Sequence, residues 1–391
     1  MNKNSIKSLY YITHINNLPS ILERGILSHK KVEELQVTYQ PIYDSGIVSK
    51  RKDKRTPERD SLWEYANLYF QARNPMMYRV VHEKEKRDIA IVGVKSEVLQ
   101  INGGFVTDGN AANDPTQFFP AKEGLKIVEN QWKIIQSDWW NDQDGSKRKI
   151  MSECLIPNQI SPEFIHSIFV VDHVAKQKVE SIIGSTQIHI VPEPHMFFQP
   201  KSAVRIGKNI SVIDGDMFFS NMQTLTISVN LQGVMGKGLA SRAKYQFPDV
   251  YVVYQDACRK KQLTATIPYL YKREASLDQE LADLSVPLST PNAVKWFLFF
   301  TTKKHWKQNS NIEDIEGGLD WVRKNYHSVG IKSLAMPALG CGLGNLTWNE
   351  VGPLMCSYLH DIDIQVAIYL PREHPIQNEY LTDNFLLKKN V

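Results

Sequence analysis

The sequence predicts two consecutive domains, an α+β domain followed by a layered α/β/α domain. The length of 391 residues exceeds the roughly 250 to 300 residues that one hydrophobic core usually sustains. Residues 191–202 contain three prolines in the stretch VPEPHMFFQPKS, and proline removes a backbone donor and stops regular structure. The hydrophobic pattern also differs on the two sides of this stretch. We therefore expect domains at 1–195 and 204–391, joined by a linker at 196–203.

The first half mixes short helices and strands. A helix is expected to begin at Leu18, capped by Asn16 or Asn17, with Pro19 tolerated in its first turn and Gly25 ending it. Short apolar or β-branched runs predict buried strands at Ile89–Val94 and Ser167–Val171. This mixture predicts an α+β domain.

The second half is more regular. Apolar runs predict strands at Ile210–Ile213, Thr224–Asn230, Trp296–Thr301, Ser333–Pro337 and Ile364–Leu370. Apolar residues at spacings of three and four predict helices between them, at 312–326 and 348–360. Strands alternating with helices predict an α/β/α domain.

Charge is concentrated in one place. The net charge of +4 and pI of about 8.6 are only mildly basic and do not decide between partner classes. Six basic residues, however, fall within residues 50–59. This run is either a contact for nucleic acid or NAD phosphates, or a solvated loop.

The cysteines and the N-terminus favour a cytoplasmic protein. Four widely spaced cysteines form no C-x-x-C pair, which argues against a zinc site or a disulfide framework. No apolar run approaches the ~20 residues that span a bilayer, and the N-terminus lacks an apolar signal region. We expect reduced thiols, no metal and no membrane association.

Two glycine-rich stretches follow predicted strands of the second half. Residues 230–240 read NLQGVMGKGLA, and residues 338–348 read ALGCGLGNLTW. Glycines let the backbone approach a ligand closely, and a following helix N-terminus favours an anion. The spacing fits neither the Rossmann nor the Walker sequence. The loops are therefore either a diphosphate cradle or simple strand-to-helix connections.

Four segments together resemble the macrodomains of the DarG family: GDMFFSN (215–221), VNLQGVMGKGLA (229–240), FTTKKHW (300–306) and MPALGCGLGNLTW (336–348). The resemblance implies a mixed central sheet and ADP-ribose as the ligand. It places Asp216 near the adenine, Asn230 near the distal ribose and Gly236 in the binding loop. The residues that it places around the diphosphate are Gly340, Cys341, Gly342, Leu343 and Gly344.

The same resemblance implies that Lys303 is catalytic. DarG-like macrodomains carry a lysine close to the anomeric carbon, and a partly neutral amine attacks such a carbon and expels the modified base. A related branch carries an acidic residue where this sequence has Gly344. Either Lys303 suffices for hydrolysis, or the domain binds ADP-ribose better than it cleaves the linkage.

The first half resembles the DarT family of ADP-ribosyltransferases. The resemblance rests on YYITHINNLPSILERGIL (10–27), the basic run with LWEYANLYFQARNPMMY (62–78), FVTDGNAA (105–112) and RKIMSECLIP (148–157). It implies NAD as substrate and single-stranded DNA as acceptor, through thymine or guanine. ADP-ribosyl transfer needs little more than one carboxylate that orients the ribose and assists deprotonation.

By this resemblance Glu153 is the catalytic glutamate, and Arg51 is a catalytic and NAD-binding arginine. His14, Asn17 and Leu18 fall in the NAD-binding segment. For DNA, Tyr69, Arg73 and the run at 50–59 offer aromatic and positive contacts.

The resulting hypothesis is a fused toxin and antitoxin, in which the first domain modifies DNA and the second removes the ADP-ribose. An intramolecular contact between the domains, masking the transferase, is a further expectation. Two alternatives stay open. One is a scaffold that binds ADP-ribose or DNA after losing activity, and the other is ADP-ribosylation of proteins.

Overall fold

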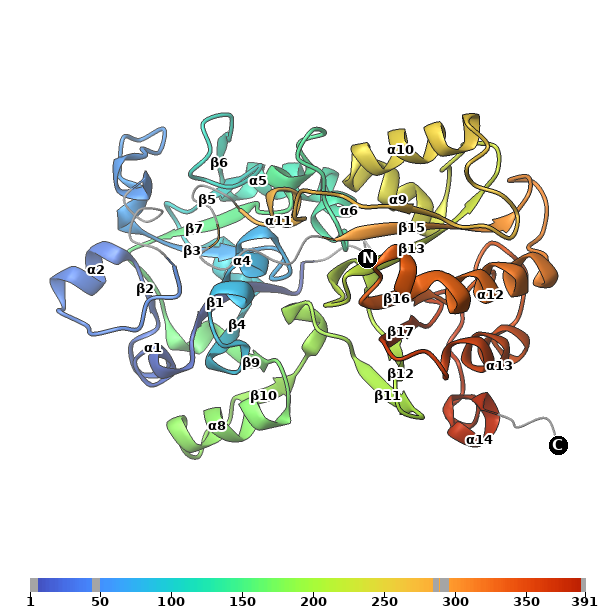
Figure 1. Cartoon of the computed structure of the whole chain (residues 1–391). Coiled ribbons are helices and arrows are strands. Elements are labelled where there is room, and N and C mark those ends of the chain that lie inside the picture. Colours follow the sequence, from blue (N-terminus) through green and yellow to red (C-terminus); the bar gives the residue numbers. More distant parts are fainter. Residues whose placement is uncertain (1–5, 44–49, 284–287, 289–294, 388–391) are drawn as a thin grey trace. The chain divides into compact units, whose positions relative to one another are not determined.

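The chain folds into two compact units in the computed structural model, which describes residues 6–43, 50–283, 288 and 295–387. Unit 1 comprises Met1–Phe198 and Asp278–Pro291, and unit 2 comprises Gln199–Leu277 and Asn292–Val391 (Figure 1). The segment 278–291 therefore belongs to unit 1, although the sequence analysis assigned it to the second domain. Backbone hydrogen bonding explains this, because Asp283 N–H donates to the carbonyl of Pro75 at 3.2 Å.

Unit 1 is an α+β domain built on an eight-stranded sheet with the order β10-β9-β4-β1-β3-β7-β5-β6. Neighbouring strands are antiparallel except for the parallel pair β9 and β10. The strands are β1 (Ser8–His14), β3 (Tyr65–Tyr69), β4 (Ile89–Lys95), β5 (Phe105–Thr107), β6 (Phe118–Pro120), β7 (Glu153–Pro157), β9 (Ile165–Val170) and β10 (His189–Pro192), with β2 (Ile26–Leu27) and β8 (Gln159–Ile160) in a separate pair.

The helices of unit 1 are mostly short. They are α1 (Leu18–Arg24), α2 (His29–Glu34), α4 (Pro75–Glu83), α5 (Ala121–Asn130), α6 (Trp132–Ile135), α7 (Ser146–Lys149), α8 (His173–Ile183) and α11 (Asp278–Leu281), with single 3-10 turns between them. Helix α1 ends at Gly25, which has φ 85°, as the sequence predicts. Asn17 occupies the N-cap position, as expected, but its side chain makes no capping hydrogen bond.

Unit 2 is built on a mixed seven-stranded sheet with the order β11-β12-β17-β16-β13-β15-β14. Its inner neighbours are parallel, and the edge strands β11 and β14 are antiparallel to their neighbours. The strands are β11 (Ser202–Ile206), β12 (Ile210–Asp214), β13 (Thr224–Asn230), β14 (Tyr269–Tyr271), β15 (Trp296–Lys303), β16 (Ser333–Pro337) and β17 (Gln365–Tyr369). The mixed sheet implied by the macrodomain resemblance is confirmed.

Helices cover both faces of this sheet. They are α9 (Gly238–Gln246), α10 (Pro248–Arg259), α12 (Ile312–Val329), α13 (Trp348–Leu359) and α14 (Asp383–Leu386). Alternate residues of β15 point to opposite faces. Phe297 and Phe299 contact aromatic rings of the α9–α10 region, whereas Leu298 and Phe300 share a core with α12 and α13. The α/β/α expectation is therefore confirmed.

The expected linker is packed. Pro194–Phe197 forms a 3-10 turn, and Phe197 and Phe198 are buried. The Phe198 ring meets Tyr78 and Trp140 edge-on, with centroids 5.5 and 6.0 Å away. These contacts fix the end of unit 1.

All four cysteines are free. Within the described ranges, no helix is long and apolar enough to cross a membrane. Among the same residues, no group of three or more His, Cys, Asp or Glu side chains could hold a metal ion.

Candidate functional sites

The carboxylate of Glu153 is the centre of the candidate site in unit 1. Glu153 begins β7, opposite Tyr69 of β3, and its side chain has no exposed surface. Arg51 donates from Nη1 to Oε1 at 3.2 Å and from Nη2 to Oε2 at 2.9 Å. The amide of Ala111 donates to Oε1 at 2.8 Å. A buried carboxylate needs such partners, because an unpaired charge in the interior is very costly.

The backbone around Glu153 is held as firmly as its side chain. Thr107 Oγ1 accepts the amide of Glu153 at 2.9 Å and donates to the carbonyl of Gly109 at 2.6 Å. This threonine therefore connects β7 to the loop that supplies Ala111. Together these contacts fix the position and orientation of the carboxylate.

The Arg51 guanidinium remains protonated in this pair. Burial opposes the charge on Arg51, but the Glu153 carboxylate and its hydrogen bonds outweigh that effect and raise the arginine pKa. Burial, followed by the nearby Glu153 charge, raises the pKa of Tyr69. The Tyr69 phenol is therefore neutral at physiological pH and retains its proton for donation.

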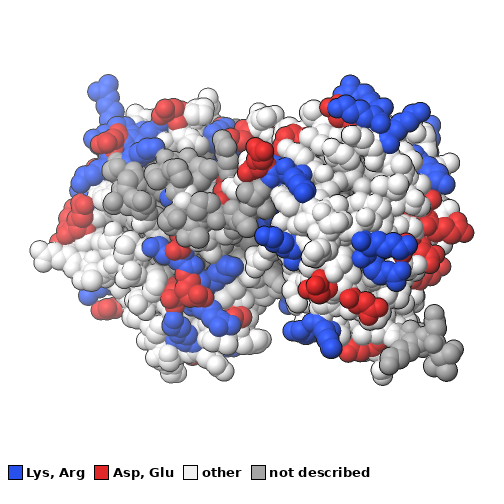
Figure 2. All heavy atoms as spheres, in the orientation of Figure 1, with Lys and Arg blue, Asp and Glu red and all other residues white. Residues whose placement is uncertain are grey.

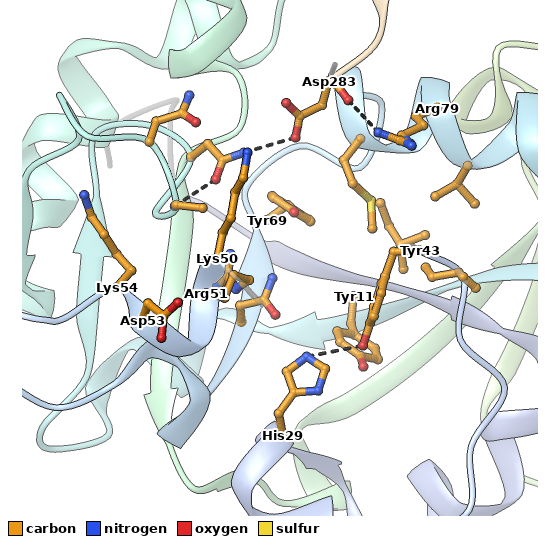
Figure 3. Close-up of a pocket in the computed structure, with 18 of the residues that line it drawn as sticks. Tyr11, His29, Tyr43, Lys50, Arg51, Asp53, Lys54, Tyr69, Arg79 and Asp283 are labelled. Atoms are coloured by element: carbon orange, nitrogen blue, oxygen red, sulfur yellow. Dashed lines mark hydrogen bonds between the residues drawn. The ribbon is translucent and has the colours of Figure 1, made fainter. Parts of the chain in front are cut away.

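A cavity of about 750 Å³ opens beside the arginine, which lies in the size range of small-molecule sites, roughly 300 to 1,000 Å³. Figure 3 shows Lys50, Arg51, Asp53, Lys54 and Tyr69 on one side and Tyr11, His29 and Tyr43 on the other. Anionic phosphates fit the first side and a flat ring fits the second. The cavity has the character of a dinucleotide site.

His29, which the sequence analysis missed, is held neutral in this cavity. Its ring stacks on Trp63 with centroids 4.2 Å apart, and Nε2 lies 3.3 Å from the Tyr43 hydroxyl. Burial and then the Arg51 charge lower the pKa of His29 to about 4. No local motif marks His29 or Tyr43, because their partners are distant in sequence.

Asp283 lines the same cavity (Figure 3). It lies in the second half of the sequence, in the segment that belongs to unit 1. Its carboxylate accepts from Asn110 Nδ2 at 3.3 Å, and its carbonyl accepts from Arg79 at 3.3 Å. Burial raises the pKa of the Asp283 carboxyl. No sequence pattern points to this residue, since it lies about 130 positions after Glu153.

The structure does not place His14, Asn17 and Leu18 on the lining of this cavity. Leu18 and Glu153 are both completely buried, and Glu153 is likewise absent from the lining, so contact of either residue with a ligand requires a movement of the side chains that cover it. Asn17 instead binds the backbone of Gln40, donating to its carbonyl at 2.9 Å and accepting its amide at 2.7 Å. The chain then continues to Ile42 and Tyr43, which do line the cavity, so Asn17 fixes the start of a segment that reaches it.

Arg73 does not provide the expected surface charge. Only 2% of the residue is exposed, and its guanidinium lies 4.6 Å from the centroid of Phe198. The run at 50–59 divides: Lys50, Arg51 and Lys54 line the cavity, whereas Lys52, Arg55 and Arg59 are exposed. On the face drawn in Figure 2, basic and acidic side chains are interspersed.

Unit 2 brings Asn230 and Lys303 together, because these residues end the neighbouring parallel strands β13 and β15 and are partners after a register shift between Val229 and Asn230. Lys303 Nζ donates to the carbonyl of Leu343. Partial burial lowers the lysine pKa. Asn230 is fixed by Tyr254, whose hydroxyl donates to its carbonyl at 2.7 Å. Its own Nδ2 donates to the carbonyl of Val234 at 2.6 Å.

The two glycine-rich loops lie side by side. A Cβ built on Gly238 would meet Leu343 Cδ1 at 3.4 Å, and one on Gly236 would meet Val234 at 3.9 Å. Leu343 is 57% exposed. Gly340 has φ 75°, which only glycine adopts easily. The loops therefore form adjacent walls beside Lys303.

Gly344 tolerates no side chain. A Cβ there would lie 2.3 Å from both the Gly340 carbonyl oxygen and Ser310 Oγ. At Gly342 the nearest atom, Glu373 Oε1, would be 3.5 Å away, an ordinary contact. An acidic residue at position 344 is thus sterically incompatible with this loop.

Other expected contributors are already engaged. The N-terminus of α13 carries a capping box in which Glu350 accepts from the Thr347 amide at 3.1 Å, so the helix end that was expected to favour an anion already holds a carboxylate. Burial raises the pKa of Cys341 to about 12, which leaves this thiol protonated. Asp216 accepts from Arg242 Nη1 at 2.8 Å through both oxygens.

The comparisons with known proteins cover both units. Residues 10–198 match the family model described as ssDNA thymidine ADP-ribosyltransferase, DarT. A DNA ADP-ribosyl glycohydrolase of Thermus aquaticus is 32% identical over 164 residues, 42% of this chain and 41% of that protein.

Two further likenesses span nearly the whole chain. A "DNA ADP-ribosyl transferase-DNA ADP-ribosyl glycohydrolase fusion protein" of Thermosipho africanus is 52% identical over 382 residues, 97% of this chain and 98% of the relative. The solved structure of Thermosipho africanus DarTG in complex with ADP-ribose is 51% identical, with TM-score 0.92, covering 97% of this chain and 100% of that chain. The chain therefore belongs to the family of fusions between a DNA ADP-ribosyl transferase of the DarT type and a DNA ADP-ribosyl glycohydrolase of the DarG type.

Proposed function

We propose that unit 1 transfers ADP-ribose from NAD to a base in single-stranded DNA, and that unit 2 removes it again. The observation that carries the proposal is the buried Arg51–Glu153 pair beside a cavity of dinucleotide size. Relatives support the substrates, since DarT of Thermus sp. 2.9 has been solved with NAD+ and with ADP-ribosylated ssDNA. Such a chain combines a toxin and its antitoxin.

In the transfer step, Glu153 holds the nicotinamide ribose and stabilises positive charge that develops at its anomeric carbon. The carbon–nitrogen bond to nicotinamide breaks, and its electron pair leaves with nicotinamide. A nucleophilic atom of the DNA base then bonds to the same carbon, and the Glu153 carboxylate accepts the displaced proton. Arg51 fixes the carboxylate and lies where it can contact NAD.

The side chains that line the cavity bind NAD, and Asn17 contributes indirectly by holding the loop to which it is hydrogen-bonded. His14 ends β1, two residues beyond the cavity residue Ile12, so a contact to NAD requires the ligand to extend along this strand. Leu18 supports the loop from the core.

In the removal step, the neutral amine of Lys303 attacks the anomeric carbon of the distal ribose. The bond to the DNA base breaks and the base leaves, and water then hydrolyses the lysine-linked intermediate. Desolvation of Lys303 favours the neutral amine that this step needs. ADP-ribose lies between the loops containing Asn230 and Gly236 and residues 340–344, with its adenine toward Asp216. No step requires a metal.

In the experiment that tests this proposal, the full chain is incubated with NAD and a single-stranded oligonucleotide. ADP-ribose adducts on the oligonucleotide are then measured by mass spectrometry. The wild type should accumulate little adduct, Lys303→Ala should accumulate it, and the same variant with Glu153→Ala should show none. Adducts on added protein instead of DNA would favour the protein-directed alternative. Binding of ADP-ribose without turnover by any variant would favour the scaffold.

Restraint of the transferase by residues 278–283 is a second proposal, favoured by the position of Asp283 in the cavity. The Asp283 side chain occupies space in the cavity beside Asn110, so Asp283→Ala should speed adduct formation in the Lys303→Ala background. A rate no greater than that of the parent would contradict this restraint.

A further inference from the structure

The loop that follows Lys303 presents an exposed aromatic ring. Trp306 is 52% exposed, although tryptophan is one of the largest apolar side chains. The His305 ring stacks beside it with centroids 5.6 Å apart and an interplanar angle of 24°. Lys307 Nζ lies 5.0 Å from the centroid of the indole ring. Polar and cationic neighbours thus contact the indole ring, and about half of the residue remains open to solvent.

Hydrogen bonds connect this loop to the glycine-rich loop. The amide of Ser310 donates to the Gly344 carbonyl at 2.9 Å, and Asn345 Nδ2 donates to Asn309 Oδ1 at 2.7 Å. Within the loop, the amide of Gln308 donates to the carbonyl of His305 at 3.0 Å. The indole is therefore displayed beside the ligand cradle on a constrained turn.

The short separation in sequence limits how far Trp306 can lie from Lys303. Three residues of extended chain reach about 10 Å at most, so Trp306 stays close to Lys303. Lys303 is the residue placed at the anomeric carbon, and the adenine end of ADP-ribose is directed toward Asp216. With Lys303 at the anomeric carbon, as proposed, the nucleotide that carries the modification lies within reach of Trp306.

The chemistry of the loop suits a single strand of nucleic acid. Bases stack on aromatic side chains, and neighbouring cations attract the phosphates. Lys304 is 61% exposed and lies 3.5 Å from Asp314, while Lys307 flanks the indole directly. Glu313, in the first turn of the following helix, adds another acidic side chain nearby.

We propose that Trp306 stacks on a DNA base adjacent to the ADP-ribosylated nucleotide and thereby selects modified DNA over other ADP-ribosylated acceptors. This inference rests on the proposed removal of ADP-ribose from DNA by unit 2. It assigns recognition of the acceptor strand to residues 304–309, separate from the loops that hold ADP-ribose.

The test compares two substrates of the full chain in the absence of NAD. One is an oligonucleotide ADP-ribosylated by the Lys303→Ala chain, and the other is the modified mononucleotide obtained from it by nuclease digestion. Trp306→Ala should raise KM for the oligonucleotide roughly 5- to 150-fold, the equivalent of the 1 to 3 kcal/mol attributed to one base stack. Its kcat should not change, and Trp306→Phe should retain most of the affinity.

Two controls separate stacking from a general defect. The mononucleotide lacks a flanking base, so all variants should cleave it equally and bind free ADP-ribose equally. Tyr245→Ala removes another aromatic ring, 51% exposed with Lys244 Nζ 5.2 Å from its centroid, and should leave the oligonucleotide KM unchanged.

An unchanged oligonucleotide KM in Trp306→Ala, an equal loss on the mononucleotide, or an equal effect of Tyr245→Ala would overturn the proposal. A wild-type chain that forms adducts but releases ADP-ribose from neither substrate would remove the proposed eraser function, and recognition by Trp306 with it. The two kinds of failure are distinguishable, because failure of the Trp306 proposal alone is measured with a wild-type chain that does release ADP-ribose.

Discussion

The two units hold their proposed catalytic groups in opposite ways. Glu153 is fully buried and is fixed by Arg51 and the amide of Ala111. Lys303 is only partly buried, and its pKa is lowered by burial. A carboxylate that stabilises developing positive charge must remain ionised, which in the interior requires a cation and hydrogen-bond donors. An amine that attacks carbon must lose its proton, which partial burial favours.

This comparison is tested most strongly at Glu153. Glu153→Gln preserves shape but removes the charge that stabilises the transition state, so DNA modification should fall by about 10²- to 10⁴-fold. NAD binding should persist, because the carboxylate acts mainly on the transition state. Adduct yield by mass spectrometry and NAD affinity by calorimetry measure the two effects.

The matched control for Glu153 is Glu64→Gln. Glu64 lies in the same unit and pairs with Lys30 at an exposed site, at 3.2 Å, where ion pairs contribute little. Its replacement should leave transfer unchanged. If Glu153→Gln modified DNA as fast as this control, Glu153 would have no catalytic role.

The glycine-rich loop of unit 2 gives the next largest effect. Gly344→Ala forces a Cβ to within 2.3 Å of two oxygen atoms, and overpacking of this kind costs about 1 to 3 kcal/mol. ADP-ribose affinity should fall about tenfold or more as the loop shifts. Gly342→Ala, with its nearest contact at 3.5 Å, is the matched control and should bind nearly normally. Equal ADP-ribose affinities of the two variants would show that the loop can move to accommodate the added Cβ atom.

The fold class and several elements could be predicted from local patterns, whereas the sites could not. Strands β4, β13 and β15 follow from β-branched and aromatic runs, and α1 ends at Gly25 as the sequence predicts. Arg51 and Glu153 were each assigned from the family resemblance, and their pairing was not predicted, since 102 positions separate them. His29, Tyr43 and Asp283 were missed because only tertiary packing brings them together.

Position 344 is another place where the sequence alone does not explain the residue that is present. The sequence shows that glycine stands where a related branch has an acid, but only packing against Ser310 explains why no acid fits. The assignment of residues 278–291 to unit 1 depends likewise on distant contacts, such as the donation from Trp140 Nε1 to the Glu280 carbonyl at 3.1 Å.

His29 predicts a pH dependence confined to unit 1. Its folded pKa of about 4 lies below the unfolded value of about 6.5, so the unfolded chain binds more protons between these values. The stability contribution is complete above pH 6.5, is lost as pH falls toward 4, and amounts to about 3 kcal/mol at most. Urea unfolding at pH 7.5 and pH 4.5 should show a smaller acid loss for His29→Gln than for the wild type. Parallel losses would exclude His29 as the source.

The smallest expected effect concerns the exposed part of the basic run. If Arg55 and Arg59 contact DNA phosphates, replacing both with Gln should reduce the slope of log affinity against log salt by about 0.7 per charge, the value for single strands. Lys122→Gln with Lys126→Gln, two exposed lysines of α5, removes the same charge elsewhere in unit 1 and serves as the control. Measurements use unmodified oligonucleotide and the Glu153→Gln chain, so that no adduct forms. If the run contacts DNA, the slope for the variant of Arg55 and Arg59 is flatter than the slope for the control variant. Identical slopes would mean that Arg55 and Arg59 only solvate the loop, and phosphate binding would then be left to Lys50 and Lys54 inside the cavity.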